Sequence, residues 1–370
     1  MNNNNGTIVY IGGFELPDKN AAAQRVIGVA KIFKKLNYRV VLIGTDKMKK
    51  GNQISDGKIL YDGFECYSEK YPQNLALWVH HVCDASRYIE LINKLEDVRI
   101  VVFYNFQSIA MAKIMRYCKK NSIKCIADAT EWYQPGGNIF RKIIKKLDTD
   151  LRMKKLHFKC DGVIAISKYL YDFYKVSVTS IKLPPTVDID DNKWRLFANS
   201  EKKYTFVYAG KATDRKERLD IIINAIENNP MASLCVVGMT KQEYEQMYND
   251  SITGKNILFK GRVTHKEAIE IVKQSEWSVI VRNRTRVNEA GFPTKVVESI
   301  SCGVPVCANE FSNIDEYLNN ENSILCENIN DINRVIDNAL HSHKLSFDRS
   351  VFDYRHYIDA MNIFLNDIYK

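Results

Sequence analysis

The sequence predicts an α/β fold of two domains, each built on a doubly wound parallel β-sheet. Its 370 residues are too many for one typical domain and suit two domains of about 150 to 200 residues each. Apolar residues make up 45% of the chain and charged residues 26%, which is typical of a protein with a buried core and excludes a disordered or fibrous chain. Short apolar runs alternate with helical patterns throughout, and this alternation predicts parallel sheets covered by helices on both faces.

The first half of the chain opens with a strand, a glycine turn, a helix and a second strand. Ile8 to Ile11 form an apolar run that ends at Gly12 and Gly13. Apolar residues then recur at helical spacing from Val26 to Leu36, and Val40 to Ile43 form the next strand. Further strands are predicted at 100–104, 124–127 and 162–166, and a helix is predicted at 168–174.

The second half repeats this alternation and is preceded by a connecting segment. Its strands are predicted at 204–209, 233–237, 256–259, 277–281, 304–308 and 323–326. The segment Leu183 to Asp191 contains two adjacent prolines and several acidic residues, which suits a connection between domains. The aromatic-rich stretch 352–370 is predicted to be a helix that crosses back onto the first domain. We therefore expect a first domain at 1–185, completed by 352–370, and a second domain at 186–351.

Several classes of protein are excluded by what the sequence lacks. It has no run of about 18 apolar residues that could span a membrane, and its first residues lack the layout of a signal peptide. The nine cysteines include no Cys-x-x-Cys pair, so neither a disulfide framework nor a zinc site is indicated and a cytoplasmic protein is expected. His80 to Asp84 contain metal-ligand residue types without a partner cluster, so no metal is predicted. No nucleic-acid-binding module is recognisable, and nucleic acid is not an expected partner.

Positive charge is concentrated in the first half. Residues 1–190 hold 30 Lys and Arg against 19 Asp and Glu, so the net charge of +9 arises there. In the densest part, 139–159, basic and apolar side chains alternate at helical spacing. This pattern is typical of a basic amphipathic helix, which is either a solvated surface helix or a contact with an anionic membrane. Asp148 and Asp150 spell Asp-x-Asp within this helix and are interpreted as solvated charges.

The most informative segment of the second half is Gly291 to Val306. Thr294 is placed to cap a helix that follows a strand, and Val296 begins the buried face of that helix. The amides and the positive dipole end at such a helix start suit a phosphate group. Lys295 and Glu298 lie in the first turns. Glu298 can accept hydrogen bonds from vicinal hydroxyls such as those of a ribose, or it can merely complement the helix dipole.

Two further segments of the second half point to the same ligand. Gly210 follows a strand, and Lys211 and Lys216 lie in the loop after it, where two cations can converge on one diphosphate. Taken alone, two solvated lysines are the simpler interpretation. Beyond a later strand, Arg262 and Val263 lie where backbone groups can meet a nucleotide base.

Together these segments resemble the second domain of the retaining nucleotide-sugar glycosyltransferases of GT-B fold, family 4 type. In that family a Gly-Arg-Leu-x-x-x-Lys segment binds the donor diphosphate, and residues 210–216 match it with Lys211 in the place of the arginine. The family also uses two glutamates separated by seven residues. Glu298 matches the second, which touches the ribose. Ala290 stands at the position of the first, which touches the transferred sugar, and Glu289 is one residue early.

The first half resembles members of that family that build bacterial surface polysaccharides. The likeness is carried by residues 20–25, 128–133, 167–170 and 183–185. Many family members have a histidine near the end of the strand that here ends at Ala127, and this chain has Asp128 and Glu131 instead. We expect one of these carboxylates to orient or deprotonate the acceptor hydroxyl and the other to be structural.

The resemblance implies a metal-independent, retaining glycosyltransferase of hexosyltransferase type. Its donor would be a nucleotide-diphosphate sugar, with a UDP-sugar favoured, and its acceptor a bacterial, lipid-linked polysaccharide. Amides near Gly12 and Gly13, together with Lys211, Lys216 and the helix that starts at Thr294, would stabilise the departing diphosphate. No cofactor is expected. The two domains are expected to face a cleft, and the protein is expected in the cytoplasm or at the inner face of the plasma membrane.

Two alternatives stay open from the sequence. One is a nucleotide-sugar epimerase on the same scaffold, which would convert the donor without an acceptor. The other is a non-catalytic module that binds a glycan or a nucleotide, and the missing first glutamate prompts it.

Overall fold

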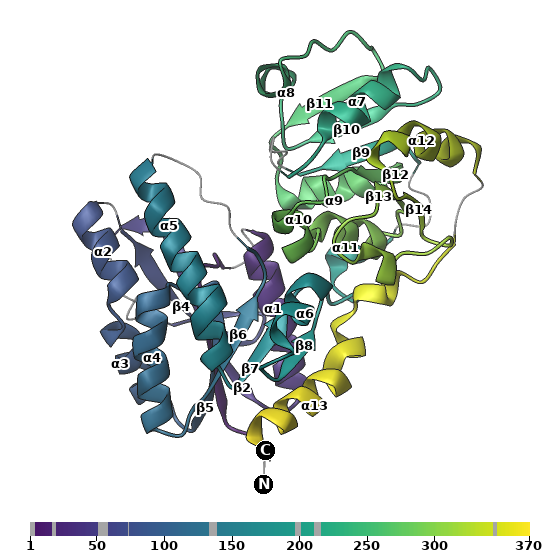
Figure 1. The fold of residues 1–370 in the computed structure, drawn as a ribbon. Helices are drawn as coiled ribbons and strands as arrows, with labels where there is room; N and C mark the ends of the chain where they lie inside the picture. The colour runs from purple at the N-terminus through teal and green to yellow at the C-terminus, as the bar shows by residue number, and fades with distance from the viewer. Residues whose placement is uncertain are drawn as a thin grey trace. The chain divides into compact units, whose positions relative to one another are not determined.

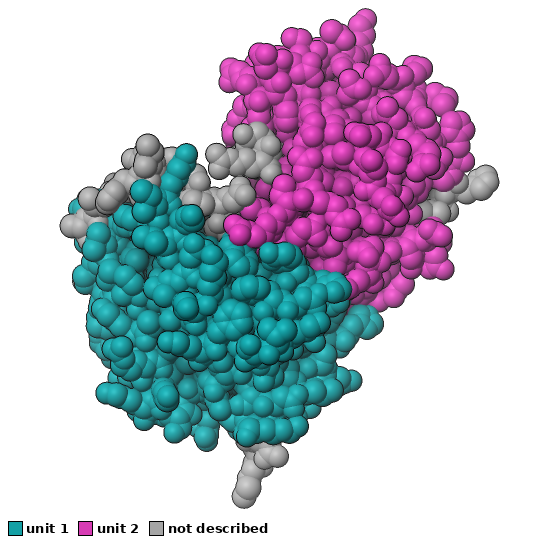
Figure 2. Space-filling model, in the orientation of Figure 1, with its two compact units in different colours: residues 1–186, 354–370 teal, residues 187–353 magenta. Residues whose placement is uncertain are grey.

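The chain forms two compact units. The computed structural model describes residues 4–16, 20–50, 58–72, 74–132, 139–196, 201–210, 216–342 and 346–370. Unit 1 consists of residues 1–186 and 354–370, and unit 2 consists of residues 187–353, as coloured in Figure 2. The first passage of the chain from unit 1 to unit 2 therefore falls between Thr186 and Val187, inside the proline-containing segment.

Unit 1 is built on an eight-stranded sheet. The strand order is β3-β4-β2-β1-β5-β6-β7-β8, and every pair of neighbours is parallel except the β3–β4 hairpin at the edge. The strands are β1 (Thr7–Gly12), β2 (Arg39–Lys50), β3 (Ile59–Tyr61), β4 (Phe64–Tyr71), β5 (Val98–Tyr104), β6 (Lys124–Ala129), β7 (Gly162–Ala165) and β8 (Ser180–Lys182).

Helices cover both faces of this sheet (Figure 1). They are α1 (Ala21–Lys35), α2 (Leu75–Cys83), α3 (Ser86–Lys94), α4 (Ser108–Lys120), α5 (Ile139–Leu151), α6 (Lys168–Tyr174) and α13 (Ile358–Tyr369). Because side chains alternate along a strand, Tyr10 of β1 faces the layer of α1 and α13, where it shares a core with Val29 and Phe364. The C-terminal helix α13 thus packs on the first sheet, as the sequence predicted.

The basic segment of unit 1 is helical, and Asp148 within it has a structural partner. Helix α5 continues through a π-helical turn, Arg152–Leu156, and a single 3₁₀ turn, His157–Lys159. Asp148 accepts a hydrogen bond from the backbone N–H of Ser108 at 2.8 Å and pairs with Arg152 at 3.4 Å. The interpretation of Asp148 as a solvated charge is therefore wrong, because this carboxylate ties α5 to the first residue of α4.

Unit 2 is built on a six-stranded parallel sheet of order β11-β10-β9-β12-β13-β14. Its strands are β9 (Tyr204–Ala209), β10 (Leu234–Val237), β11 (Ile257–Gly261), β12 (Ser275–Ile280), β13 (Val306–Asn309) and β14 (Ser323–Cys326). Its helices are α7 (Leu219–Glu227), α8 (Lys241–Tyr248), α9 (His265–Lys273), α10 (Arg286–Ala290), α11 (Thr294–Ser301) and α12 (Ile332–His341).

Two hydrophobic clusters hold the layers of unit 2 together. Phe206 of β9 packs with Ile222 of α7 and Ile336 of α12 on one face. Val207 of the same strand packs with Ile269 of α9 on the other. Helices α8 and α9 each begin with a capping box, in which a threonine side chain and the glutamate three residues later satisfy each other's backbone N–H groups. The loops at the carboxyl ends of the parallel strands therefore lead into well-defined helix starts.

Within the described parts of the chain, no helix is both long enough and apolar enough to cross a bilayer.

Candidate functional site

A buried ionic cluster forms at the carboxyl edge of the sheet in unit 2. Tyr208 lies near the end of β9, Glu217 precedes α7, Arg282 follows β12 and Lys295 lies in the first turn of α11. Lys295 Nζ lies 2.6 Å from Glu217 Oε2, and Arg282 Nη2 lies 2.6 Å from Glu217 Oε1. The Tyr208 hydroxyl donates to Glu217 and accepts from Lys295 Nζ at 2.9 Å. One carboxylate is thus held by two cations and a phenol.

The electrostatics of this cluster favour an anionic ligand. Burial alone would raise the pKa of Glu217, whose side chain is 3% exposed, but Lys295 and Arg282 lower that pKa to about 2. Burial lowers the pKa of Lys295, and the charge of Glu217 opposes this shift. Two cationic side chains are paired with one carboxylate at a strand-end position, so the cluster has an excess of positive charge for a ligand such as a phosphate.

Gly210 and Lys295 come together, as two segments predicted to bind the donor should. Gly210 adopts a φ of +142°, and a Cβ atom at this position would lie 2.3 Å from Lys295 Cε. The glycine therefore lets the lysine stem pass across the end of β9 and reach Glu217. Lys211, the other lysine of the predicted diphosphate loop, lies outside the described residues.

Lys216 is anchored through its backbone by an asparagine that the sequence did not single out. Asn288 of α10 is 1% exposed, and its Nδ2 donates to the carbonyl oxygens of Lys216 at 3.0 Å and Asn283 at 2.8 Å. This pairing fixes the loop after β12 against the residue that precedes Glu217. The Lys216 side chain is half-buried at the same edge of the sheet.

The start of α11 differs from the sequence prediction in one respect. The N-cap residue is Pro293, which makes no side-chain cap, and Thr294 is the first residue of the helix. The prediction that Thr294 caps α11 is therefore wrong, because the proline already supplies the extended backbone that precedes the first turn. Val296 is fully buried and its N–H donates to the carbonyl oxygen of Pro293 at 3.1 Å, which leaves Val296 no group to offer a phosphate.

Glu298 meets a histidine at the second helix start of this edge. His265 is the first residue of α9, and its Nε2 lies 3.1 Å from Glu298 Oε1. Arg262 is mostly exposed and pairs with Glu243 of α8 at 2.5 Å, so its side chain is not part of the buried cluster. Val263 packs against the hydrophobic cluster beneath α9, which leaves its backbone as the part that could meet a base.

The position of the missing family glutamate is filled by a core residue. Ala290 is fully buried, and Glu289 accepts a hydrogen bond from the N–H of Ser312 at 3.1 Å. Glu289 thus fastens α10 to the loop after β13.

In unit 1, Asp128 is an interior residue. Its side chain is fully buried, Arg25 Nη2 lies 3.0 Å from its Oδ1, and the Tyr10 hydroxyl donates to its Oδ2. Arg25 Nη1 also donates to the carbonyl oxygens of Leu183 and Pro184 at 2.7 and 2.6 Å. Both carboxylate oxygens of Asp128 are therefore occupied away from solvent, which suits the structural member of the two predicted carboxylates.

Glu131 and the glycine turn lie at the carboxyl edge of the first sheet. Glu131 follows β6 by two residues and is half-buried. Gly12 ends β1 beside Tyr104, whose carbonyl oxygen would lie 2.3 Å from a Cβ at Gly12, so this glycine serves close strand packing. Gly13 is exposed and has open space around its Cα. Gly13 and Glu131 are thus two groups at this edge, among the described residues, that a ligand could reach.

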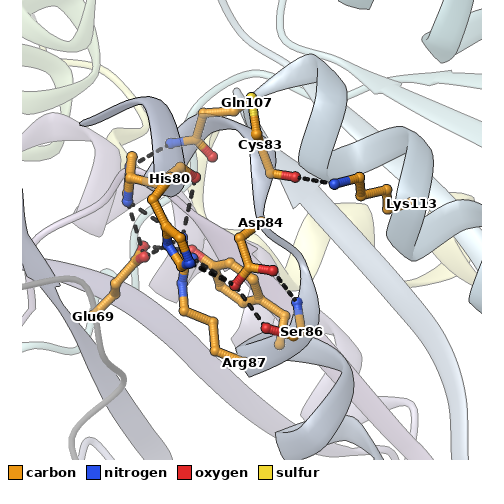
Figure 3. Close-up of polar contacts among 10 residues, drawn as sticks. Glu69, His80, Cys83, Asp84, Ser86, Arg87, Gln107 and Lys113 are labelled. Atoms are coloured by element: carbon orange, nitrogen blue, oxygen red, sulfur yellow. Dashed lines mark hydrogen bonds and ion pairs between the residues drawn. The ribbon is translucent and has the colours of Figure 1, made fainter. Parts of the chain in front are cut away.

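The histidine pair near α2 belongs to a second polar cluster (Figure 3). His81 Nδ1 lies 2.9 Å from Glu69 Oε1, and Gln107 Nε2 lies 2.8 Å from His81 Nε2. Arg87 pairs with Glu69, and Tyr88 donates to it. The cluster joins β4, α2, α3 and the start of α4. In the described parts of the chain, no group of three or more His, Cys, Asp or Glu side chains has a metal-binding arrangement.

Sequence reasoning missed four side chains of the unit 2 site: Tyr208, Glu217, Arg282 and His265. Glu217 follows Lys216 directly, and an acidic residue next to a lysine predicted to bind phosphate was the one signal present in the sequence. Arg282 lies 65 residues from Glu217 and meets it because β9 and β12 are neighbours in the sheet. That strand order cannot be obtained from apolar periodicity.

Comparisons with known proteins concern the fold of the chain and the family of its second unit. Residues 189–350 match the model of the family described as glycosyl transferases group 1. No curated protein matches the chain. Sucrose-phosphate synthase from Thermosynechococcus elongatus is similar in structure, with 13% identity over 98% of this chain and 99% of that chain and a TM-score of 0.67.

Two further solved structures share the fold. The catalytic domain of starch synthase IV from Arabidopsis thaliana, bound to ADP and acarbose, has 10% identity over 99% of this chain and 100% of that chain, with a TM-score of 0.72. HepE from Anabaena, in complex with UDP-glucose, has 12% identity over 98% of this chain and 99% of that chain, with a TM-score of 0.65. These likenesses confirm the predicted fold class, GT-B. The match of residues 189–350 to the group 1 family model, in a chain of GT-B fold, supports a glycosyltransferase.

Proposed function

We propose that this protein is a retaining glycosyltransferase of family 4 type that transfers a hexose from a UDP-sugar to a lipid-linked bacterial polysaccharide, without a metal. Donor binding is assigned to unit 2 and acceptor binding to unit 1. The observation that carries the proposal is the meeting of Lys295, Arg282 and Glu217 beside Gly210, inside the region that matches the group 1 family. The UDP-glucose bound to HepE, which has the same fold, supports the choice of donor.

In this proposal, unit 2 stabilises the leaving group of the reaction. Breaking the bond between the anomeric carbon and the diphosphate places negative charge on the departing UDP. Lys295, whose ammonium is held by Glu217, and Lys216, whose backbone is anchored by Asn288, are suited to neutralise that charge as it grows. Glu298 would accept a hydrogen bond from the ribose. The Lys295 ammonium needs little reorganisation at the moment of transfer, because Glu217 and Tyr208 already hold it in place.

The chemistry asked of unit 1 is orientation of the acceptor. The acceptor hydroxyl oxygen forms the new bond to the anomeric carbon, and its proton must leave. Glu131 is the candidate that orients or deprotonates this hydroxyl, since Asp128 is engaged by Arg25 and Tyr10. Front-face attack, in which the new bond forms on the side that the diphosphate leaves, would retain the anomeric configuration.

A lipid-linked acceptor requires access to a membrane, and α5 has a surface that suits this. Ile143, Leu147 and Leu151 are 53%, 64% and 41% exposed, and their spacing of four residues places them on one stripe of the helix. Exposed lysines flank the stripe at 142, 145, 146, 154 and 155. Exposed aliphatic side chains among lysines favour a contact with an anionic lipid surface over a helix that faces only solvent. Burying large apolar side chains away from water is favourable in free energy.

The experiment that tests the donor site measures UDP release from UDP-glucose and other UDP-sugars, with and without a lipid-linked glycan acceptor. Lys216→Ala and Glu298→Ala should each reduce transfer at least tenfold while the melting temperature stays within a few degrees. Lys255→Ala and Glu321→Ala are matched controls, because these exposed residues precede β11 and β14 and so lie at the opposite edge of the sheet. Unchanged turnover in both site variants would remove the assignment.

The same assay separates the rival functions. An epimerase would convert the UDP-sugar to its stereoisomer without acceptor, and a binding module would bind UDP without releasing it from a UDP-sugar. Acceptor-dependent release of UDP supports the transferase.

A further inference from the structure

The contact between His265 and Glu298 joins two helix starts of unit 2. His265 is the first residue of α9, directly after the Thr264 cap, and Glu298 lies one turn into α11. Their side chains are 32% and 18% exposed, and the distance from His265 Nε2 to Glu298 Oε1 is 3.1 Å. Both residues therefore line the accessible side of the edge at which the donor is proposed to bind.

The chemistry of the two groups fixes the direction of this hydrogen bond. An ionised carboxylate can only accept, so His265 Nε2 must carry the hydrogen and donate it to Oε1. The α9 capping box holds the backbone of His265, since Thr264 and Glu267 satisfy each other's N–H groups. Glu298 lies on α11, whose apolar face is buried by Val297 and Ile300. Each partner is thus mounted on a fixed element.

We propose that His265 is a positioning residue for recognition of the nucleotide ribose. It holds Glu298 Oε1, so that the carboxylate is oriented before the donor arrives and Oε2 is presented to a ribose hydroxyl. This inference rests on the proposed function, because it assumes that Glu298 meets the ribose. It adds a residue that neither the family match nor the sequence motifs assign.

The physical reason for such a device is the freedom of a glutamate side chain. Glu298 has three rotatable bonds, and ordering them at the moment of binding would cost affinity. A hydrogen bond to His265 made in the unliganded protein removes part of that cost. The Lys295 cluster would still bind the diphosphate without His265. A variant that lacks this histidine should therefore lose the part of its affinity that comes from the ribose hydroxyls.

The experiment compares two ligands on four proteins by calorimetric titration. The ligands are UDP and 2′,3′-dideoxy-UDP, which lacks both ribose hydroxyls. The proteins are the wild type, His265→Ala, His265→Gln and Glu298→Ala. His341→Ala, on α12 of the same unit, is the matched histidine control. Melting temperatures of all variants are measured alongside.

The expected result is a loss of discrimination. Wild type should bind UDP about 10-fold more tightly than the dideoxy analogue, and His265→Ala should reduce this ratio roughly 3-fold or more, in keeping with the loss of one hydrogen bond. His265→Gln, whose Nε2 can still donate, should restore most of it, and His341→Ala should leave it unchanged. A merely structural role would weaken both ligands equally.

The outcomes separate this inference from the proposed function. If Glu298→Ala lowers the ratio and His265→Ala does not, the positioning role is wrong while the donor site stands. If wild type does not bind UDP, or if Glu298→Ala leaves the ratio intact, the proposed UDP-sugar site is wrong and the inference falls with it. If His265→Gln behaves like His265→Ala while both fold, donation from Nε2 is not the cause.

Discussion

Lys295 passes so close to Gly210 that a Cβ atom at position 210 would lie 2.3 Å from Lys295 Cε. This approach explains how a lysine in α11 reaches Glu217, which precedes α7, across the end of β9. A side chain at position 210 would displace the lysine from its carboxylate. The glycine of the predicted diphosphate loop therefore has a second role, which is to admit a cation from another segment.

Gly210→Ala should reduce both stability and donor binding. The positive φ of 142° and the clash with Lys295 predict a loss of about 1 to 3 kcal/mol in the free energy of unfolding. Gly13→Ala is the control for stability, because the space around that Cα is open. Urea denaturation of both variants and titration of Gly210→Ala with UDP check this prediction. Equal stability of the two variants would show that Lys295 gives way at no cost.

Glu217 should make the stability of unit 2 depend on acidic pH. The pKa of this carboxyl is about 2 in the folded protein and 4.5 without these contacts, so its contribution is fully present above pH 4.5 and is lost as the pH falls towards 2. The shift corresponds to roughly 3 kcal/mol. The stability gap between wild type and Glu217→Gln should therefore narrow between pH 5 and pH 3 in urea titrations. A stability gap that does not change between pH 5 and pH 3 would mean that Lys295 and Arg282 do not lower the pKa of this carboxyl.

Substitutions at Asp128 and Glu131 should have different effects, one on stability and the other on turnover. Asp128→Asn leaves the buried Arg25 without its ion pair, which should cost about 3 to 5 kcal/mol of unfolding free energy. Glu131→Gln changes a half-buried strand-end residue and should leave the melting temperature near that of wild type while lowering turnover. Thermal unfolding and acceptor-dependent UDP release distinguish the two variants. A stable Asp128→Asn enzyme without activity would return the acceptor role to Asp128.

The exposed face of α5 should bind anionic vesicles. Ile143→Glu with Leu147→Glu should abolish sedimentation with vesicles that contain phosphatidylglycerol, and charge reversal of Lys142, Lys145 and Lys146 should weaken it at roughly 1 kcal/mol per lysine. Pure phosphatidylcholine vesicles should bind weakly.

Two control variants test whether the effect belongs to α5. Val176→Glu changes a 74% exposed aliphatic residue elsewhere on unit 1, and Lys119→Glu with Lys120→Glu changes the last turn of α4. Both should leave vesicle binding unchanged. Equal loss in the control and α5 variants would attribute the binding to net charge, and no binding by wild type would exclude the membrane contact.

The regular elements could be predicted from the sequence to different extents, for physical reasons. Strands β9 and β14 and helix α6 have the predicted bounds, because their apolar runs end at turn residues or at a serine cap. Strands β3 and β8 contain three residues each, too few for a period to be recognised. The antiparallel pairing of β3 with β4 was not predicted, because β3 was not recognised as a strand.

The candidate site was predictable only where it is local in sequence. Gly210, Lys295 and Glu298 lie beside strand ends and helix starts that the local sequence pattern predicts. The burial of Asp128 was not predictable, because Arg25 lies 103 residues away and reaches it only after α1 packs on the first sheet. The same holds for His265 and Glu298, which are 33 residues apart and meet because α9 and α11 cover one face.

The central claim is that the carboxyl edge of unit 2 binds a nucleotide diphosphate. A crystal structure of the protein soaked with UDP tests it most directly. The account predicts the diphosphate within hydrogen-bonding distance of Lys216 or Lys295, and the ribose against the Glu298 carboxylate. A nucleotide bound elsewhere, with Lys295 and Glu298 both facing solvent-filled space, would contradict it.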